Sequence, residues 1–545
     1  MNGSARSLRT LIALTAFPAV TLAQLPTIHT FGGVSAGDAF GGGAAGGGDV
    51  DADGIPDFIA GANLDDDNGP ECGAAFVFSG ADGSLIYTLF GDSAGDRFGT
   101  SVDILGDLDG DGHDEFIVGA PFDENGALAD AGSATVYSGQ TGTVMFQVFG
   151  TGAGDHLGQS VSDAGLVNSD PCPDFIVGAP LDDTANGFNS GSATVYSGLT
   201  GLPIHTLLGE AIGDEFGGAV AGAGRQDADL LDDVIVGAVR NDPINIDDGS
   251  AYVFAGSNGA LIRKIPAIGA GDRFGWSVAC AGDLDADGFD EVIVGALTND
   301  NPGLDSGHAR VFSGSNGAQM YAFEGDGAGD HFGTSVSGAG DVNGDGTPDL
   351  VVGAPPADPI AGGMNSGLIR IFSGVDGSEI ATYAGLAIGD GLGAAVDELG
   401  DINGDGFDDV IAGAALGDSL AGADAGYIFA YSVCGHESYG SCGAIQALSM
   451  QYVTALDQIE VTGGTPFATM LLLVSLDRVA GCPLLVDMSH PLSFFLTTSF
   501  NAIGEFSLVQ PLQDPGLAGF SFSLQALELS SQLVTSNGVQ VVFCN

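Results

Sequence analysis

Acidic side chains recur at alternate positions in short loops along the chain. Five nine-residue segments follow the pattern D-x-[DN]-x-D-G-x-x-[DE]. Alternate side chains of a tight loop converge on one point, the Gly at the sixth position permits a sharp turn, and the backbone carbonyl of the seventh position adds an oxygen. The residues at the first, third, fifth and ninth positions are Asp49, Asp51, Asp53 and Asp57; Asp107, Asp109, Asp111 and Glu115; Asp283, Asp285, Asp287 and Glu291; Asp341, Asn343, Asp345 and Asp349; and Asp401, Asn403, Asp405 and Asp409.

This set of oxygen ligands favours calcium. Ca²⁺ takes six to eight hard oxygen ligands at roughly 2.3–2.6 Å, and without a cation several carboxylates so close together would repel one another. The alternative is a set of solvated Asp/Gly turns, but five copies in one register, each directly before an apolar run, favour metal binding. The sequence therefore predicts about five bound calcium ions. The resemblance to an EF-hand is local, because strand-like segments flank each loop and the Glu at the twelfth position is absent.

Two further copies of the loop have lost ligands. In the third copy Leu166 stands at the first position and Pro171 replaces the Gly, while Asn168, Asp170 and Asp174 remain. In the fourth copy Arg225 stands at the first position, followed by Asp227, Asp229 and Asp233 at the other three. The guanidinium of Arg225 could partly replace the charge of a metal ion. We expect no calcium in either loop.

The loops lie within a long internal repeat. A Gly-Asp-x-Phe/Leu-Gly turn occurs seven times at intervals of 58 to 60 residues, a Gly-Ala pair follows an apolar run in every copy, and an aromatic-Ser/Ala-Gly sequence closes six copies. Three series in a common register indicate repeated structural units. The Asp residues of the seven turns are Asp38, Asp96, Asp155, Asp214, Asp272, Asp330 and Asp390.

Each repeat predicts four short strands. In the second copy, strand-like runs cover residues 100–105, 115–120, 133–138 and 144–149, separated by Gly, Asp and Asn clusters. Four antiparallel strands repeated seven times, without helical periodicity between them, predict an all-β fold with a seven-bladed β-propeller. The seventh copy lacks an outer strand, and residues 26–31 form such a run before the first copy. We expect this N-terminal strand to complete the last blade, which would close the ring and remove its free sheet edges.

Composition limits the kinds of partner. Lys and Arg total 11 against 71 Asp and Glu in 545 residues, a formal net charge of −60. Such a surface repels nucleic acid and anionic lipid head groups, so neither is an expected partner. With 44% hydrophobic residues, the chain is expected to fold despite its acidity.

The two ends of the chain differ from the repeats. Residues 1–23 have a basic start, a short apolar run interrupted by Pro18, and small residues before Gln24, which predicts a secretory signal peptide and a secreted or cell-surface protein. No later apolar run is long enough to be an expected transmembrane segment. We assign residues 24–433 to the propeller, 434–443 to a linker and 444–545 to a small β-sandwich-like domain. Cys434 with Cys442 and Cys482 with Cys544 are candidate disulfides, and Cys280 is expected to be a buried thiol.

The repeat resembles the FG-GAP repeat family, which forms the seven-bladed propeller of integrin α-subunit head regions and occurs in many bacterial secreted proteins. Phe98-Gly99, Gly119-Ala120-Pro121 and the Asp-rich loops match the family pattern in order, over about residues 25–433. The resemblance implies calcium loops on one face of the ring and protein binding by the loops of the opposite face. Those second-to-third strand loops are acidic, with Asp65, Asp66, Asp67, Asp123, Glu124, Asp182, Asp183, Asp247, Asp248, Asp300 and Asp305. Integrin leg domains and a transmembrane segment are not found.

Function is predicted from this framework. The leading hypothesis is an adhesion or ligand-binding module for an extracellular protein or glycan, acting as a monomeric propeller, because a rigid ring presents a broad surface built from loops. The alternatives are a polysaccharide- or lipid-acting hydrolase or lyase on a propeller scaffold, and a purely structural cell-surface component. No G-x-S-x-G, H-E-x-x-H or comparable catalytic motif is found, so the balance favours a protein that is not an enzyme.

Overall fold

The structure is a computed structural model that describes residues 27–33, 35–242, 247–267, 269–359, 363–418 and 423–433, and the backbone of three strands between 469 and 508. The chain divides into two compact units, Met1–Gly435 and His436–Asn545. Among the described residues there is no helix that could cross a membrane. The predicted signal peptide, the linker and the candidate disulfides lie outside the described residues.

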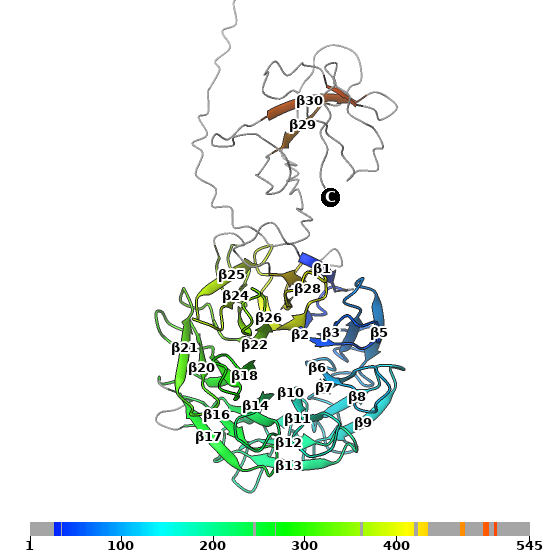
Figure 1. Ribbon diagram of the computed structural model, residues 1–545. Coiled ribbons are helices and arrows are strands. Elements are labelled where there is room, and N and C mark those ends of the chain that lie inside the picture. Colours follow the sequence, from blue (N-terminus) through cyan, green and yellow to red (C-terminus); the bar gives the residue numbers. More distant parts are fainter. Residues whose placement is uncertain are drawn as a thin grey trace, which may run out of the picture. The chain divides into compact units, whose positions relative to one another are not determined.

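Seven four-stranded antiparallel sheets make up the first unit, arranged as blades around a ring (Figure 1). The first strand of each blade is innermost and contacts the first strands of both neighbouring blades. These inner strands are β2 (Phe40–Gly48), β6 (Ser101–Gly106), β10 (Ser160–Gly165), β14 (Phe216–Gly224), β18 (Phe274–Gly282), β22 (Ser335–Gly340) and β26 (Leu392–Gly400).

The second and third strands form the middle of each blade. Every residue of every second strand is buried, because neighbouring blades cover both faces of the sheet. The second strands are β3 (Asp57–Ala62), β7 (Glu115–Ala120), β11 (Asp174–Ala179), β15 (Asp233–Ala238), β19 (Glu291–Ala296), β23 (Asp349–Ala354) and β27 (Asp409–Ala414). The third strands are β4 (Ala74–Phe78), β8 (Ser133–Tyr137), β12 (Ser192–Tyr196), β16 (Ser250–Phe254), β20 (His308–Phe312), β24 (Leu368–Phe372) and β28 (Tyr427–Ser432).

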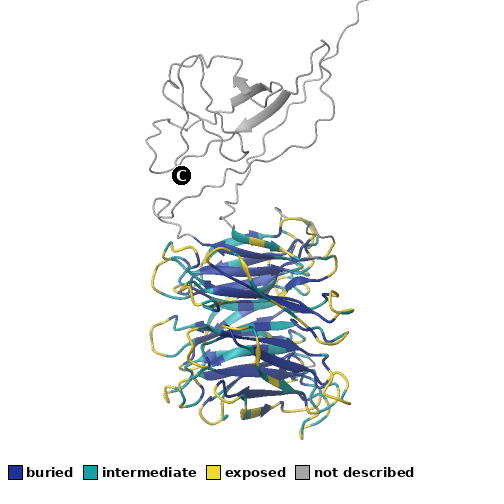
Figure 2. Ribbon diagram, turned by 90° about the vertical axis from the view of Figure 1, so that its right-hand side faces the viewer, coloured by how far each residue is buried: buried dark blue, intermediate teal, exposed yellow. Residues whose placement is uncertain are grey.

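The outer strands are partly exposed, and exposed residues otherwise gather in the loops (Figure 2). Six outer strands follow the third strand of their own blade, namely β5 (Leu85–Phe90), β9 (Val144–Phe149), β13 (Pro203–Leu208), β17 (Leu261–Pro266), β21 (Gln319–Glu324) and β25 (Glu379–Ala384). The seventh is β1 (Thr27–Gly32), which pairs antiparallel with β28 from Thr27 opposite Tyr431 to Gly32 opposite Tyr427. The predicted closure of the ring by the N-terminal strand is therefore confirmed.

Two glycine markers of the repeat meet where adjacent blades touch. A Cβ on Gly61 would lie 1.9 Å from the carbonyl oxygen of Gly99 in the next blade, and a Cβ on Gly413 would lie 2.0 Å from that of Gly41, where the ring closes. The amide of Gly99 in turn donates to the carbonyl of Gly119. The Phe-Gly and Gly-Ala markers thus recur together because no side chain fits between the backbones of neighbouring blades.

The second unit contains a three-stranded antiparallel sheet of β29 (Thr469–Val474), β30 (Phe494–Phe500) and β31 (Phe506–Leu508). β29 pairs with β30 from Thr469 opposite Ser499 to Val474 opposite Phe494. These strands fall within the region expected to be all-β. The β-sandwich-like arrangement of residues 444–545 stays a prediction, since most of that range lies outside the described residues.

Candidate metal centre

The Asp-rich segments connect the first and second strands of each blade. We call the seven segments Asp loops 1 to 7; they cover residues 49–57, 107–115, 166–174, 225–233, 283–291, 341–349 and 401–409. All of them leave the same end of the inner strands, so they share one face of the ring, the Asp-loop face. The opposite end, with the second-to-third strand loops and the turns that precede the first strands, is the rim face.

Hydrogen bonds within loop 1 hold its carboxylates in place. The side chain of Asp49 accepts the amides of Asp53 at 3.0 Å and Gly54 at 2.9 Å, and Asp51 accepts the amide of Asp53 at 3.1 Å. Asp53 in turn accepts the amide of Ile55 at 2.8 Å. The chain turns sharply at Gly54, whose φ of +86° is accessible to Gly at little cost.

The fixed carboxylates converge as a cation site requires. One oxygen each from Asp49, Asp51 and Asp53 lie within 4.8 Å of one another. Oxygens that share a Ca²⁺ ion at roughly 2.3–2.6 Å can be no more than about 5 Å apart. The same criterion is met in loop 2 by Asp107, Asp109 and Glu115 and in loop 5 by Asp283, Asp285 and Glu291. The donor set of these three loops, carboxylates throughout, fits a hard divalent cation.

Loops 6 and 7 have the same backbone but carry Asn at the third position. In loop 6, Asp341 accepts the amides of Asp345 at 3.0 Å and Gly346 at 2.8 Å, as Asp49 does in loop 1. The Asn343 amide group donates to both oxygens of Asp349, at 3.0 and 2.8 Å, and Asn403 makes the equivalent pair of bonds to Asp409. In both loops the Asn at the third position therefore contacts the acid at the ninth, and each loop carries one fewer negative charge than each of the other three. The convergence of three carboxylates seen in loops 1, 2 and 5 is not found in these two loops.

The acid at the ninth position, which we call the anchor, is fully buried in all seven loops. Asp57 accepts the amides of Val50 and Asp51 and, across the blade, the amide of Gly80 at 2.9 Å. Burial raises the pKa of Asp57 to about 7 and that of Asp409 to about 8. The anchor thus joins its loop to the turn between the third and outer strands, besides being a candidate ligand. The anchors are Asp57, Glu115, Asp174, Asp233, Glu291, Asp349 and Asp409.

The two degenerate loops keep part of this architecture. In loop 4 the oxygens of Asp227, Asp229 and Asp233 still lie within 4.8 Å of one another, so the loss of the first ligand has not dispersed the other three. Leu230 takes the place of the Gly and adopts the same left-handed conformation, with a φ of +73°. Arg225 forms none of the ion pairs found among the described residues, so the expected substitution of a guanidinium for the metal is not seen as a direct contact.

Four further Asp residues, which sequence reasoning did not single out, link the Asp loops of adjacent blades. The eighth-position Asp114 of loop 2 accepts the amide of Asp49 in loop 1 at 2.7 Å, and the Asp114 amide donates back to the Asp49 carbonyl at 3.0 Å. We call this reciprocal pair a clamp. Equivalent clamps join Asp232 to Leu166, Asp290 to Arg225 and Asp408 to Asp341, each with a side-chain bond of 2.7 Å. Loops 1, 3 and 6 have Pro56, Pro173 and Pro348 at this position.

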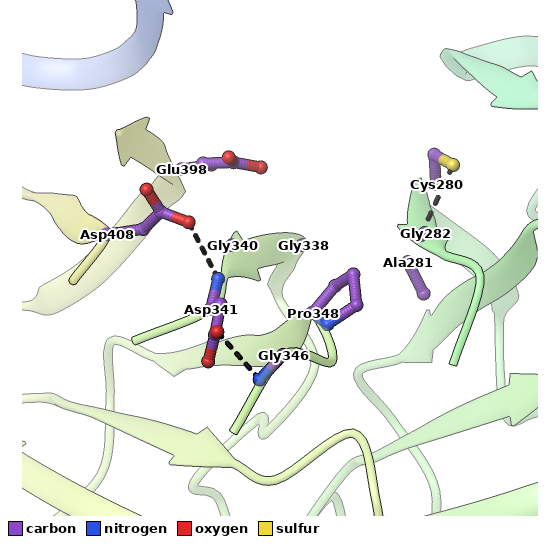
Figure 3. A pocket seen from close by; sticks show the side chains of 10 residues that line it. All are labelled: Cys280, Ala281, Gly282, Gly338, Gly340, Asp341, Gly346, Pro348, Glu398 and Asp408. Atoms are coloured by element: carbon purple, nitrogen blue, oxygen red, sulfur yellow. Dashed lines mark hydrogen bonds between the residues drawn. The ribbon is translucent and has the colours of Figure 1, made fainter. Parts of the chain in front are cut away.

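A cavity of about 420 Å³ opens beside loop 6 and the ends of three inner strands (Figure 3). Its polar lining comes from Cys280, Asp341, Glu398 and Asp408, and the rest is Gly, Ala and Pro. Cys280 is a free thiol, half-buried rather than buried as expected, and burial raises its pKa to about 12. A protonated thiol among carboxylates, without a His or Lys in the lining, offers no activated nucleophile.

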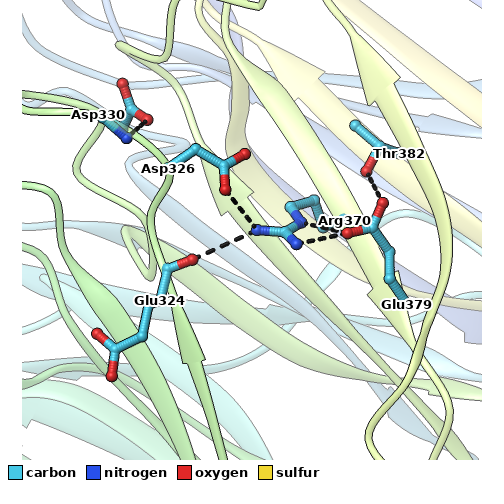
Figure 4. Close-up of polar contacts among 7 residues, drawn as sticks. Glu324, Asp326, Asp330, Arg370, Glu379 and Thr382 are labelled. Atoms are coloured by element: carbon cyan, nitrogen blue, oxygen red, sulfur yellow. Dashed lines mark hydrogen bonds and ion pairs between the residues drawn. The ribbon is translucent and has the colours of Figure 1, made fainter. Parts of the chain in front are cut away.

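The rim face is acidic, but its acids are of two kinds. Asp66, Asp67, Asp183 and Asp300 are exposed, whereas Asp65, Asp123 and Asp248 are buried, so only part of the acidic set faces solvent. Cations also lie among these acids: Arg97 pairs with Glu71, and Arg240 pairs with Glu215. Arg370 pairs with Glu379 and Asp326 and donates to the carbonyl of Glu324, while nearby Asp330 accepts the amide of Gly327 (Figure 4).

The ring with its repeated Asp loops defines a class, the β-propellers with acidic loops between the first and second strands. Sequence comparison then finds FG-GAP repeats over residues 98–137, 268–312, 332–372 and 398–431. These stretches contain Asp loops 2, 5, 6 and 7. The chain therefore contains FG-GAP repeats in four of its seven blades, as its sequence pattern predicted.

Integrin α subunits are among the similar proteins. Identity is 31% over 227 residues to integrin alpha-5 of Xenopus laevis, 29% over 209 residues to integrin alpha-V of Gallus gallus, and 29% over 216 residues to integrin alpha-2 of Mus musculus. These matches cover 36%, 35% and 36% of this chain but only 20%, 19% and 17% of the relatives. A solved chain of BBS1N in complex with ARL6DN aligns over 75% of this chain and 97% of its own length, with 10% identity and a TM-score of 0.46.

Proposed function

We propose that this protein is a calcium-dependent ligand-binding module that acts outside the cell or at its surface, as a monomeric ring that binds a protein or glycan. The observation that carries the proposal is the convergence of carboxylate oxygens in the Asp loops of an integrin-α-like propeller. Calcium in loops 1, 2, 5, 6 and 7 would neutralise clustered charge in a chain of net charge −60 and so rigidify the ring. The signal-like residues 1–23 support export.

Exposed apolar side chains favour the rim face as the binding surface. Among the described residues, six large apolar side chains are at least 65% exposed, and five of them, Phe188, Ile212, Leu304, Met364 and Ile388, lie on the rim face. Four of them form two pairs, Phe188 with Ile212 and Met364 with Ile388, where a loop meets the following turn. The amide of Gly213 donates to the carbonyl of Phe188, and that of Gly389 donates to the carbonyl of Met364, both at 3.0 Å. Large apolar groups framed by acids are typical of protein-binding surfaces, so a protein with basic and apolar contacts is the favoured ligand.

The test compares the two faces. The full secreted chain would be screened on arrays of extracellular matrix proteins and of glycans in 1 mM calcium, together with the variants F188S/I212S and L230S. Leu230 is the matched control, since it is 72% exposed but lies on the Asp-loop face. We expect a captured partner whose binding is lost in F188S/I212S, kept in L230S, and abolished by chelation. Binding lost in L230S alone, or unaffected by chelation, would contradict the proposal.

A further inference from the structure

Pairs of buried carboxylates lie on the rim face, at the opposite end of the inner strands from the Asp loops. Asp38 and Asp96, from the repeated Gly-Asp turn, are 2% and 3% exposed, and each faces the acid that follows the second strand of its blade, Asp65 or Asp123. A backbone hydrogen bond in each blade places the two acids side by side. In the first blade the amide of Leu64 donates to the Asp38 carbonyl, and in the second the amide of the residue before Asp123 donates to the Asp96 carbonyl, both at 3.3 Å.

In the second blade a third acid completes the group. Asp92, Asp96 and Asp123 each place an oxygen within 4.8 Å of the others, the spacing that a shared Ca²⁺ ion permits. Asp92 is exposed and opens the group to solvent, while Asp96 and Asp123 are buried. Arg97 is engaged elsewhere, 3.0 Å from Glu71 and over a Phe ring. The group therefore has access for an ion and three converging carboxylates.

In the first blade the pair has a polar atom without a partner. Asp65 is 1% exposed, one of its oxygens accepts the amide of Asp67, and its Oδ2 accepts no hydrogen bond. The reason is local: at the start of the third strand this blade has Ala74, whereas the third blade has Ser192, whose hydroxyl donates to Asp182 at 2.7 Å. A buried carboxylate oxygen that lacks a donor and faces a second carboxylate calls for a positive species beside it.

The fourth blade supplies an internal comparison. There the position of Asp65 is occupied by Asn241, whose amide donates to Asp214 at 3.0 Å and whose oxygen accepts the Ser250 hydroxyl at 2.9 Å. Every polar atom of that contact has a partner and only one charge is buried. The first two blades have a second carboxylate where the fourth blade has the amide donor. Such a carboxylate pair stabilises the fold only if something else supplies a positive charge.

We propose that the acid pairs Asp38/Asp65 and Asp96/Asp123, the latter together with Asp92, bind divalent cations of the calcium type on the rim face. These ions are additional to any in the Asp loops. They lie at the opposite end of inner strands of nine and six residues, about 20–30 Å away at roughly 3.3 Å per residue. The sites do not depend on the loops being occupied.

The test uses the substitution that the protein itself carries in the fourth blade. D65N and D123N, singly and together, should fold, because Asn241 shows that the position accepts Asn; a single cooperative melting transition in each variant would confirm this. Calcium bound per full chain would be counted by equilibrium dialysis against radiolabelled calcium at 1 mM. D111N, in Asp loop 2, is the matched control on the other face. Diffraction from crystals grown in calcium would place the ions by anomalous scattering.

We expect each rim variant to bind one ion fewer than the parent and the double variant two fewer, with anomalous peaks beside Asp65 and Asp123. An unchanged count in the double variant would overturn this inference. If D111N is the only variant that lowers the calcium count, calcium binding by the Asp loops is supported and the inference of rim sites is wrong. If the parent binds no calcium, the proposed function falls as well.

Discussion

Asp loops 3 and 4 keep part of the hydrogen-bond pattern of the other five although the acid at their first position is missing. Loop 4 keeps the bonds from the Asp229 amide to Asp227 and from the Leu231 amide to Asp229, and loop 3 keeps the equivalent pair. What they lose is the acceptor at the first position, which in loop 1 takes the amides of Asp53 and Gly54. The anchors and clamps thus suffice to shape an Asp loop, and the first-position acid distinguishes the loops expected to bind metal.

The largest expected effect is that of removing calcium from the whole ring. A site at a hundredfold excess of free calcium over Kd contributes about 2.7 kcal/mol of stability, and loops 1, 2, 5, 6 and 7 would all contribute. We therefore expect EDTA to lower the melting temperature of the full chain markedly, measured by calorimetry with and without 1 mM calcium. A melt that does not change in EDTA, for protein first shown to contain calcium, would contradict a stabilising role.

Anchor removal separates the two roles of the ninth position. D57A leaves the amides of Val50, Asp51 and Gly80 without their acceptor, and in a degenerate loop D174A does the same to the Gly198 amide and to both bonds from the Asn168 side chain. Lost acceptors of this kind cost about 1–3 kcal/mol each. We expect both variants to be destabilised to a similar extent in EDTA, and D57A to be further destabilised relative to its parent in calcium. If D174A did not lower the stability of the fold, the anchors would act only through the metal.

Loop 4 can be converted into a binding loop. R225D restores the first-position acid beside the existing group of Asp227, Asp229 and Asp233, and Leu230 already has the left-handed backbone needed there. We expect one additional calcium ion and a calcium-dependent gain of about 2.7 kcal/mol at a hundredfold excess over Kd. In EDTA the variant should be less stable than the parent, because a fourth carboxylate joins the group.

L166D is the matched control for R225D. Loop 3 has Pro171 at the sixth position, and the Pro ring fixes φ near −65°, so this loop cannot adopt the conformation seen at Leu230. We expect L166D to gain no ion. Calcium counts by equilibrium dialysis would check both variants, and an additional ion in L166D but not in R225D would reverse the argument.

Spacing within one repeat was enough to predict the ring and its closure by β1, because those features repeat every 58 to 60 residues. The ligand sets of the Asp loops stay a prediction. Spacing within one repeat could not predict the contacts between blades. The partner of Asp114 lies 65 residues away in the previous blade, and only the curvature of the ring brings the two together. The eighth position is always Asp or Pro, which is visible in the sequence, but the sequence alone does not indicate what the Asp residues contact. Likewise, Asp65 belongs to an acidic run, and nothing in its neighbours indicates that it alone is buried.

The smallest expected effect concerns the clamps, and it separates loop shape from metal affinity. D114A removes the acceptor of the Asp49 amide in a matching loop, and D232A removes that of Leu166 in a degenerate one. Each loses a single partly exposed hydrogen bond, so we expect about 1 kcal/mol of destabilisation in EDTA for both.

Only D114A should also weaken calcium binding, because the backbone of Asp49 carries a first-position ligand and that of Leu166 does not. Denaturant unfolding in EDTA would measure the shared loss of stability, and a calcium titration would measure the difference between the two variants. If D232A lowered calcium affinity as much as D114A, clamps would act on the ring as a whole. The first-position acid would then not be what sets the matching loops apart from the degenerate ones.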